Sequence, residues 1–342
     1  MLLIPAAFYA LGSELSSPGT DLPAALLTWA CLWLLLAEPE SPLVWLTLAV
    51  TPVLAMTVKL STAPLLLFSL YALYKLRHPS HRRALAAALV VMAGILLPWL
   101  LRNVILTGYL IYPQTTLDLF QVDWKVPLDA VAAESDAVLA WGRLPGQPVD
   151  ETLALPLTVW LPQWFDNLSR GQQALVTASA LAPLVTLWYA WRTPAMREKV
   201  IIVTLGLYLG WMYWLTSAPA IRFGYGYTLG LVVLAAGCIL VWLAERAAIV
   251  SRYLPTLIGL LIGAYLILFL VQSFNPRILN EFALLPAPYP SLPTVPCHIQ
   301  NATIFVGQEY QQCWDAPIPC APYCNPNLAL RGSSLAEGFY IP

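Results

Sequence analysis

The residues best suited to chemistry in this sequence are two carboxylates and three cations that lie near the ends of apolar segments. Glu14 and Asp21 precede one apolar run, and Lys59, Arg102 and Arg222 lie close to the ends of others. A charge placed in or near the hydrocarbon of a membrane costs on the order of 2.5–3.5 kcal/mol on insertion scales. Charges at such positions are therefore candidates for function.

Glu14 and Asp21 are seven residues apart. On a single helix this spacing puts both carboxylates on one face, although Pro18 and Gly19 favour a turn between them, and either arrangement keeps them close. For Asp21, helix capping is an equally good explanation, because an Asp before Leu-Pro is a common helix start. Glu14 has no comparable structural explanation. Both are taken as candidate catalytic residues.

Lys59 lies between two apolar runs with almost no loop between them. On position alone, snorkelling of its ammonium to lipid headgroups is the favoured explanation. The hydroxyls of Ser61 and Thr62 beside it would equally suit an anionic phosphate, which binds charged donors strongly. Lys59 is therefore a candidate phosphate-binding residue with Ser61 as a supporting residue.

Arg222 precedes a Gly and Tyr run at the start of another apolar segment. Its planar guanidinium can bind phosphate or carboxylate through two parallel hydrogen bonds, which a lysine cannot do. Tyr225 is a candidate supporting residue, although tyrosines also gather at membrane interfaces. Arg102 is a third candidate for phosphate binding, or a stop signal after an apolar run.

Several kinds of chemistry lack their residues here. The sequence has no Walker phosphate loop, no Gly-x-Ser-x-Gly, no His-Glu-x-x-His and no dinucleotide glycine fingerprint. It has only three histidines, His78, His81 and His298, so histidine-based metal or triad mechanisms are disfavoured. We predict no cofactor and no metal site from motifs, and leave a divalent metal open. With a net charge of −1, nothing indicates nucleic acid as a partner.

The elements that must position these residues are membrane helices. The 342 residues are 59% hydrophobic and 10% charged, whereas soluble domains carry about 25% charged residues. The fold class predicted is all-α integral membrane, with eight to nine transmembrane helices. The apolar N-terminal stretch is too short to span, so we expect a longer parent chain that begins earlier. Eight spans are predicted near 22–37, 43–58, 60–76, 84–101, 173–191, 200–217, 226–244 and 253–273.

Basic residues orient these spans. Three short loops, at 75–83, 192–199 and 245–252, hold nine of the seventeen Lys and Arg residues, and cytoplasmic loops are rich in these residues. The opposite loops are then external, including 102–172 and the tail 274–342. We therefore expect a transmembrane domain over 1–273 and an extracytoplasmic domain over 274–342. The apolar segment 155–162 in the external loop is too short to span and is predicted to be interfacial.

Cysteine placement agrees with this orientation. Cys31 and Cys238 fall in predicted spans, whereas the other four fall in the external tail, where disulfides persist if the compartment is oxidising. We expect one or two disulfides; four cysteines allow three pairings, and the sequence does not choose among them. Their spacing matches no standard zinc pattern. The disulfide candidates are Cys297, Cys313, Cys320 and Cys324.

Several segments resemble a group of bacterial multi-pass membrane proteins that is similar to the GT-C superfamily of polyprenyl-phosphate-dependent glycosyltransferases. The resemblance runs from Glu14 to the tail. It is carried by Glu14-Leu-Ser-Ser-Pro-Gly-Thr-Asp21-Leu-Pro, Val58-Lys59-Leu-Ser-Thr-Ala-Pro64, Arg102-Asn-Val-Ile-Leu-Thr-Gly108, Asp123-Trp-Lys-Val-Pro127, Arg222-Phe-Gly-Tyr-Gly and Cys313-Trp-Asp-Ala-Pro-Ile-Pro-Cys320.

GT-C enzymes, such as protein O-mannosyltransferases, take a sugar from a lipid phosphate on the external face. The resemblance implies a polyprenyl-phosphate-linked sugar and membrane lipid as partners, and an inner-membrane location. It implies a carboxylate, Glu14 or Asp21, that deprotonates the acceptor, and Lys59, Arg222 and Arg102 as cations that stabilise the departing phosphate. The family's usual catalytic carboxylate follows the first helix and has no match in this sequence.

Two other functions remain open. A lipid or polysaccharide transporter would need ionisable residues near the midplane and paired broken helices, and the centres of the predicted spans hold almost no charge. A non-catalytic envelope assembly subunit is the third hypothesis. An Asp or Glu just after a preceding span in an upstream sequence would favour the transferase.

The predicted orientation is directly testable. Reporter fusions at residues 140 and 330 should both report the non-cytoplasmic side, because loop charge and the cysteine cluster agree. A third fusion within 192–199 should report the cytoplasm as an internal control. Reporters at 140 and 330 that land on opposite faces, or both in the cytoplasm, would contradict the topology.

Overall fold

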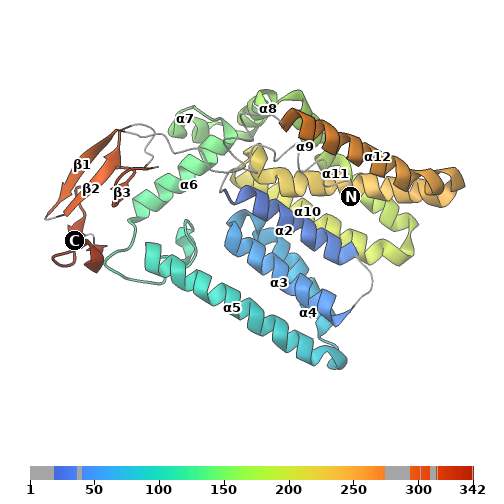
Figure 1. The fold of residues 1–342 in the computed structure, drawn as a ribbon, viewed down its shortest axis with the longest axis horizontal. Coiled ribbons are helices and arrows are strands. Elements are labelled where there is room, and N and C mark those ends of the chain that lie inside the picture. Colours follow the sequence, from blue (N-terminus) through green and yellow to red (C-terminus); the bar gives the residue numbers. More distant parts are fainter. Residues whose placement is uncertain are drawn as a thin grey trace. The chain divides into compact units, whose positions relative to one another are not determined.

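A computed structural model describes residues 19–36, 41–273, 293–300, 302–308, 313, 315–340 and 342. Glu14 and the apolar N-terminal stretch lie outside these residues. The described chain is mostly helical (Figure 1). Its α-helices are α2 (Asp21–Leu36), α3 (Pro42–Val58), α4 (Leu66–Leu76), α5 (Arg82–Thr107), α6 (Leu128–Arg143), α7 (Val149–Ala154), α8 (Leu157–Asn167), α9 (Arg170–Arg192), α10 (Arg197–Ser217), α11 (Ile221–Arg246) and α12 (Ala248–Ser273).

Helix forms at each of the eight predicted spans, but fewer segments are long and apolar enough to cross a membrane. Within the described residues four qualify: Pro79–Thr107, Arg170–Arg192, Pro194–Ser217 and Ile221–Arg246. The count of eight to nine is corrected to four by length and composition, because Asp21–Leu36, Pro42–Val58, Leu60–Leu76 and Thr256–Leu268 are apolar helices of only 10–17 residues. Two of these, α2 and α3, have 16 and 17 residues. At 1.5 Å per residue these helices extend about 24–26 Å, short of a hydrocarbon core of about 30 Å.

The chain divides into two compact units. The first contains Met1–Trp99 and Ala133–Leu266, and the second contains Leu100–Ala132 and Ile267–Pro342. Residues 102–132 of the predicted external loop thus group with the C-terminal tail, not with the rest of the helices. The remainder of that loop contains most of α6 and all of α7 and α8, and the sequence did not predict α6 or α7. The helix α8 includes most of the segment 155–162 predicted to be interfacial.

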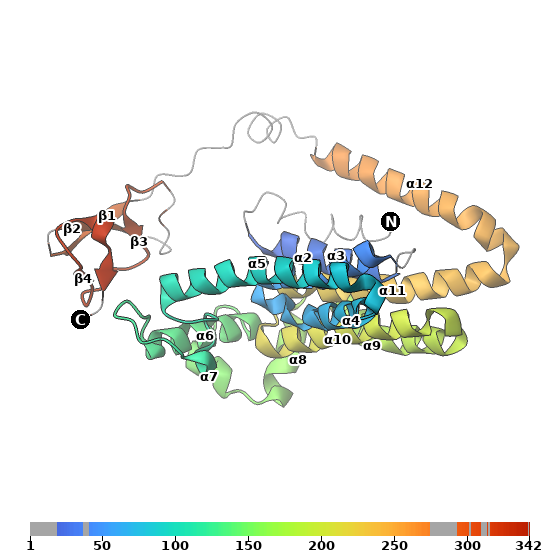
Figure 2. The ribbon, with the colours of Figure 1, turned by 90° about the horizontal axis from the view of Figure 1, so that it is seen from below.

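The first unit is a bundle in which α2, α3, α4, α9, α10 and α11 lie side by side (Figures 1 and 2). The pairs α9–α11, α3–α4 and α2–α3 are in extensive contact. The shared core includes Leu48, Phe68, Leu207 and Trp214, each almost fully buried. Because the buried and exposed faces of these helices are both apolar, packing within the bundle leaves many large apolar side chains on its surface.

Helix ends in this unit follow local sequence signals. Ser41 caps α3, where its Oγ accepts from the Val44 amide at 3.3 Å, and Pro42 occupies the first turn. Ser169 caps the start of α9 in a reciprocal capping box, in which Gln172 Oε1 accepts a hydrogen bond from the Ser169 amide at 2.9 Å. These caps fix where each helix starts.

In the second unit, the residues after α5 turn back on the end of that helix. Gly108 follows the last residue of α5 with a positive φ of 79°, a conformation that favours glycine, and its amide bonds to the Val104 carbonyl at 2.9 Å. The Tyr109 hydroxyl donates to the Val126 carbonyl at 3.1 Å, and Trp124 Nε1 donates to the Val104 carbonyl at 3.3 Å. The segment is therefore folded.

The tail of this unit contains β-structure that the all-α prediction missed. Strands β1 (Thr294–Ile299), β2 (Ala302–Gly307) and β3 (Cys320–Ala321) form one sheet, with β1 and β2 antiparallel (Figure 2). Strands β4 (Ala329–Leu330) and β5 (Phe339–Tyr340) form a second. Strands β3, β4 and β5 have two residues each, too few to give an alternating pattern in the sequence, and Pro296 interrupts the six-residue β1.

All four tail cysteines form disulfides. Cys297 pairs with Cys324, with Cα atoms 5.8 Å apart, and Cys313 pairs with Cys320, with Cα atoms 5.9 Å apart. The structure thus contains one of the three pairings that the sequence allowed. Cys297 also packs with Ile299 and Ile304 in the small core of the tail. The Cys297–Cys324 disulfide therefore joins β1, next to this core, to the segment before β4.

An ion pair joins the tail to residues 100–132 within this unit. The Arg331 guanidinium donates two hydrogen bonds to the Asp123 carboxylate, each 2.7 Å long. These bonds hold the pKa of the Asp123 carboxyl below its ordinary value. Planar, bidentate pairs of this kind are the strongest class of surface ion pair.

The Asp123 pair should make the second unit sensitive to acid. Because the pKa of Asp123 is lower in the folded state than in the unfolded state, its contribution is present above about pH 4 and is lost as pH falls through the folded-state pKa. Asp123→Asn should therefore flatten the acid side of a plot of thermal midpoint against pH. The control is Asp129→Asn, which removes an exposed carboxylate from the same unit. Equal acid profiles for wild type and Asp123→Asn would contradict the assignment.

Candidate functional site

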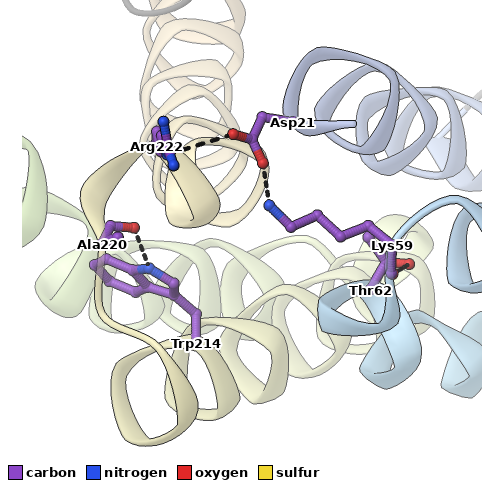
Figure 3. Close-up of polar contacts among 6 residues, drawn as sticks. All are labelled: Asp21, Lys59, Thr62, Trp214, Ala220 and Arg222. Carbon is purple, nitrogen blue, oxygen red and sulfur yellow. Dashed lines mark hydrogen bonds and ion pairs between the residues drawn. The ribbon is translucent and has the colours of Figure 1, made fainter. Parts of the chain in front are cut away.

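Asp21 is the point at which three segments of the first unit meet. It is the first residue of α2, Lys59 lies between α3 and the 3₁₀ helix η2 (Leu60–Leu65), and Arg222 is the second residue of α11. The Lys59 ammonium forms an ion pair and hydrogen bond with Asp21 Oδ1. Arg222 Nε lies 3.6 Å from Asp21 Oδ2 (Figure 3). Each carboxylate oxygen therefore faces a different cation.

The three side chains differ in exposure. The Asp21 side chain is 9% exposed, that of Lys59 is 18% exposed and that of Arg222 is 53% exposed. A carboxylate removed from water to this degree requires a compensating charge, and loss of its partner would leave an uncompensated ion. Arg222 is the member that an incoming ligand can reach first.

An aromatic ring lies next to both cations. The Lys59 ammonium is 3.6 Å from the centroid of the Phe223 ring, and the Arg222 guanidinium carbon is 5.0 Å from the same centroid. Cations are attracted to the faces of aromatic rings within about 6 Å. Phe223 therefore helps to keep two like charges close to one another.

Lys59 is placed by an abrupt change of helix type. Its backbone is extended, with φ −152° and ψ 120°, and its amide closes α3 on the Ala55 carbonyl at 2.9 Å. Its own carbonyl accepts from the amide and the hydroxyl of Thr62, at 3.0 and 2.9 Å, which begins η2. The two helices meet at this one residue, so its position is fixed by both.

Arg222 is placed by the turn that precedes α11. Trp214 Nε1 donates to the Ala220 carbonyl at 2.9 Å (Figure 3), and Trp164 Nε1 donates to the Pro219 carbonyl at 2.8 Å. Gly224 lies directly against the Trp214 ring, where a side chain would clash. The glycine thus permits the close packing of α11 on α10 that sets where Arg222 begins the helix.

The next turn of α11 packs on α2. Trp29 Nε1 donates to the Gly226 carbonyl at 3.0 Å, and a Cβ on Gly226 would lie 3.2 Å from Thr28 Oγ1. The Tyr227 hydroxyl donates to the Ser61 carbonyl at 2.9 Å. These contacts tie α11 to the two segments that carry Asp21 and Lys59.

A small cavity lies inside this cluster. Its volume is about 10 Å³, and its lining includes Asp21, Lys59, Ser61, Arg222 and Tyr227. Such a volume holds about one water molecule. A larger ligand would therefore have to meet the cluster from the exposed side of Arg222 or displace a side chain.

The structure brings together Asp21, Lys59, Ser61 and Arg222 from the residues that the sequence indicated. Tyr225 lies to one side, where it packs against Ala25, Trp29 and Leu229, and Tyr227 lines the cavity in its place. Arg102 is an exposed residue of α5 in the second unit.

Phe223 and Trp214 were not predicted from the sequence as site residues. Phe223 adjoins Arg222 in the chain, and this adjacency was the available signal. Nothing in the sequence connected Trp214 to the site, because its role is a hydrogen bond to a backbone carbonyl.

No group of three or more His, Cys, Asp or Glu residues that could hold a metal ion occurs in the described part of the chain. The chemistry of the cluster is instead that of two cations around one carboxylate. Such an arrangement can bind an anion with two or more oxygens, provided that Asp21 gives up at least part of its pairing.

Comparison with known proteins gives one match. A family model described as a domain of unknown function (DUF8201) matches residues 1–229. No curated protein and no solved structure matches the chain.

If Asp21 joins the three segments, Asp21→Asn should destabilise the first unit by about 3 kcal/mol, because two cations lose their counter-charge in a partly buried site. Unfolding of the full chain in mixed detergent micelles measures this. The control, Asp136→Asn, removes an exposed carboxylate from α6. A double-mutant cycle with Lys59→Ala should give a coupling energy above about 0.5 kcal/mol. Additive effects of the two substitutions on the free energy of unfolding would show that the Asp21–Lys59 pair contributes nothing to stability.

Proposed function

We propose that this chain, which belongs to the DUF8201 family, is a membrane transferase of the GT-C type that moves a sugar from a polyprenyl-phosphate donor to an acceptor hydroxyl. The observation that carries the proposal is the convergence of Lys59 and Arg222 on one carboxylate at helix ends. The matched family region includes all three of these residues.

The two cations suit the phosphate of such a donor. Arg222 can offer a planar fork to two phosphate oxygens, and Lys59 adds a point charge. Arg222 is half-exposed, so it can reach a headgroup while the polyprenyl tail stays in lipid. Stabilising the charge that develops on a leaving phosphate is a large contribution to catalysis.

The proposed reaction is an inverting substitution at the anomeric carbon. A carboxylate takes the proton of the acceptor hydroxyl, and the acceptor oxygen forms a bond to the anomeric carbon. The bond between that carbon and the phosphate oxygen breaks, and its electron pair leaves with the phosphate. Lys59 and Arg222 compensate the resulting negative charge.

Asp21 and Glu14 are the proposed carboxylates. In the structure both oxygens of Asp21 face cations, so neither is free to approach an acceptor hydroxyl. Donor phosphate would compete for Lys59 and Arg222 and so release Asp21 to accept a proton. Glu14 is the second candidate, and Arg102 is a further proposed cation for the phosphate.

The proposed location is the inner membrane, with the Asp21 cluster near the external face. Four helices long and apolar enough to cross a membrane support insertion. The side is proposed from the distribution of Lys and Arg among the loops, and the predicted external placement of the disulfide-bearing tail agrees with it.

A structural ion pair is the competing explanation for the cluster. The low exposure of Asp21 and the cavity of about 10 Å³ favour it, because neither leaves room for a sugar phosphate without movement. The two explanations predict different rates of sugar transfer for well-folded variants in which Lys59 or Arg222 is replaced conservatively.

If Arg222 binds the donor phosphate, Arg222→Lys should lower transfer by on the order of a hundredfold, because the charge remains but the bidentate fork is lost. The measurement is transfer from a polyprenyl-phosphate sugar by the full chain in nanodiscs, with monodispersity as the folding check. The matched control is Arg246→Lys at the opposite end of α11, which should transfer at the wild-type rate.

Lys59 provides a second arm of the same experiment. If Lys59 serves only as the structural partner of Asp21, well-folded Lys59→Arg and Lys59→Gln variants should both transfer normally; if it binds phosphate, a well-folded Lys59→Gln variant should fail. Near-wild-type transfer by a well-folded Arg222→Ala, Lys59→Ala double variant would reject the proposed phosphate site.

A further inference from the structure

The second unit contains a cleft that the proposed reaction does not use. Its volume is about 910 Å³, within the range of about 300–1,000 Å³ typical of small-molecule sites. Its lining comes from the end of α5, from the segment that follows, and from the tail around β4 and β5. A ligand in it would therefore touch three parts of the same unit.

The lining favours an apolar ligand. Ile105, Leu106, Val126, Leu328 and Phe339 supply most of the apolar side of the cleft. Asn325 and Arg331, two of the polar side chains that line it, already have partners, and the hydroxyl-bearing Tyr323 and Tyr340 line it as well. Asn325 Oδ1 accepts from the Asn327 amide at 3.0 Å, and Arg331 binds Asp123. Few polar groups remain for a ligand with many hydroxyls, whereas a hydrocarbon chain needs none.

The cleft lies at the end of a candidate membrane span. Ile105 and Leu106 belong to the last turn of α5, within the span Pro79–Thr107. Each is 57% exposed, and Leu101 one turn earlier is 60% exposed. A lipid chain beside this end of α5 can therefore pass directly into the cleft. Trp124, Tyr323 and Tyr340 line it as well, and such rings favour the level of lipid headgroups.

The charges at the cleft select among lipids. Arg331 lines the cleft and is 33% exposed. Its partner Asp123 lies just outside the lining, is 50% exposed and makes the pair neutral. A zwitterionic headgroup complements such a pair, because its phosphate can approach the guanidinium and its ammonium the carboxylate. An anionic headgroup would find no net positive charge. The pair thus disfavours a polyprenyl phosphate.

We propose that this cleft binds one zwitterionic phospholipid, with an acyl chain against Ile105 and Leu106 and the headgroup opposite Arg331 and Asp123. The site requires that α5 is inserted in a membrane. It does not depend on the proposed transfer reaction, because none of its residues belongs to the Asp21 cluster.

The test is native mass spectrometry of the full chain, delipidated in detergent and then exposed to one lipid at a time. The probes are phospholipids with ethanolamine or glycerol headgroups and a polyprenyl phosphate. We expect one ethanolamine lipid to be retained in preference to the other two.

A matched pair of variants on one helix locates the site. Leu106→Gln places an amide in the cleft and should weaken retention by roughly tenfold, whereas Leu101→Gln, at nearly the same exposure but outside the cleft, should retain lipid normally. Asp123→Asn leaves Arg331 without its counter-charge and should shift the preference toward the glycerol headgroup. Peptide mapping without reduction checks that both tail disulfides are intact in every variant.

Three results would overturn the proposal. Equal losses for Leu106→Gln and Leu101→Gln would place the lipid outside the cleft. Preference for polyprenyl phosphate over the ethanolamine lipid would reject the zwitterionic ligand. Retention of no lipid by the wild-type chain would reject a lipid site altogether.

Discussion

Removing a carboxylate from water is costly unless opposite charge compensates it, and Asp21 meets this requirement with two cations from distant parts of the chain. The pairing requires the first turn of α2, the junction of α3 and η2, and the first turn of α11 to be adjacent. The helices between these points pack in an arrangement that keeps the three ends together. The ion pairs therefore constrain the bundle as well as forming its candidate site.

The close packing of α11 makes this convergence geometrically feasible. Gly224 lies against the Trp214 side chain, and Gly226 lies against the Thr28 side chain, so α11 has no side chain of its own at the two positions where it approaches α10 and α2. Tryptophan and tyrosine donors then bind the carbonyls of Ala220, Gly226 and Ser61. Small residues allow close approach, and these polar bonds fix the depth and rotation of the helix.

The two units are stabilised by different interactions. The first has a large apolar core made of helices. The second has short strands and a small core, and it gains constraint from two disulfides and from the Arg331–Asp123 pair. Small cores commonly need covalent support of this kind. The apolar cleft belongs to the second unit.

The sequence alone located the apolar helices of the first unit and α5 and α12, because runs of apolar residues broken by charge and proline mark them, but it did not locate α6 and α7. It also identified Asp21, Lys59 and Arg222, since a charge at the end of an apolar run is costly without a function or a partner. Only the tertiary structure decided that these residues pair with one another, because Asp21 and Lys59 are 38 positions apart and no local pattern links them. Likewise, the rotation of α11 placed Tyr227 rather than Tyr225 at the cavity, and the path of the tail selected one of three disulfide pairings. Helix position is set by composition along the chain, whereas pairing and rotation are set by contacts between distant segments.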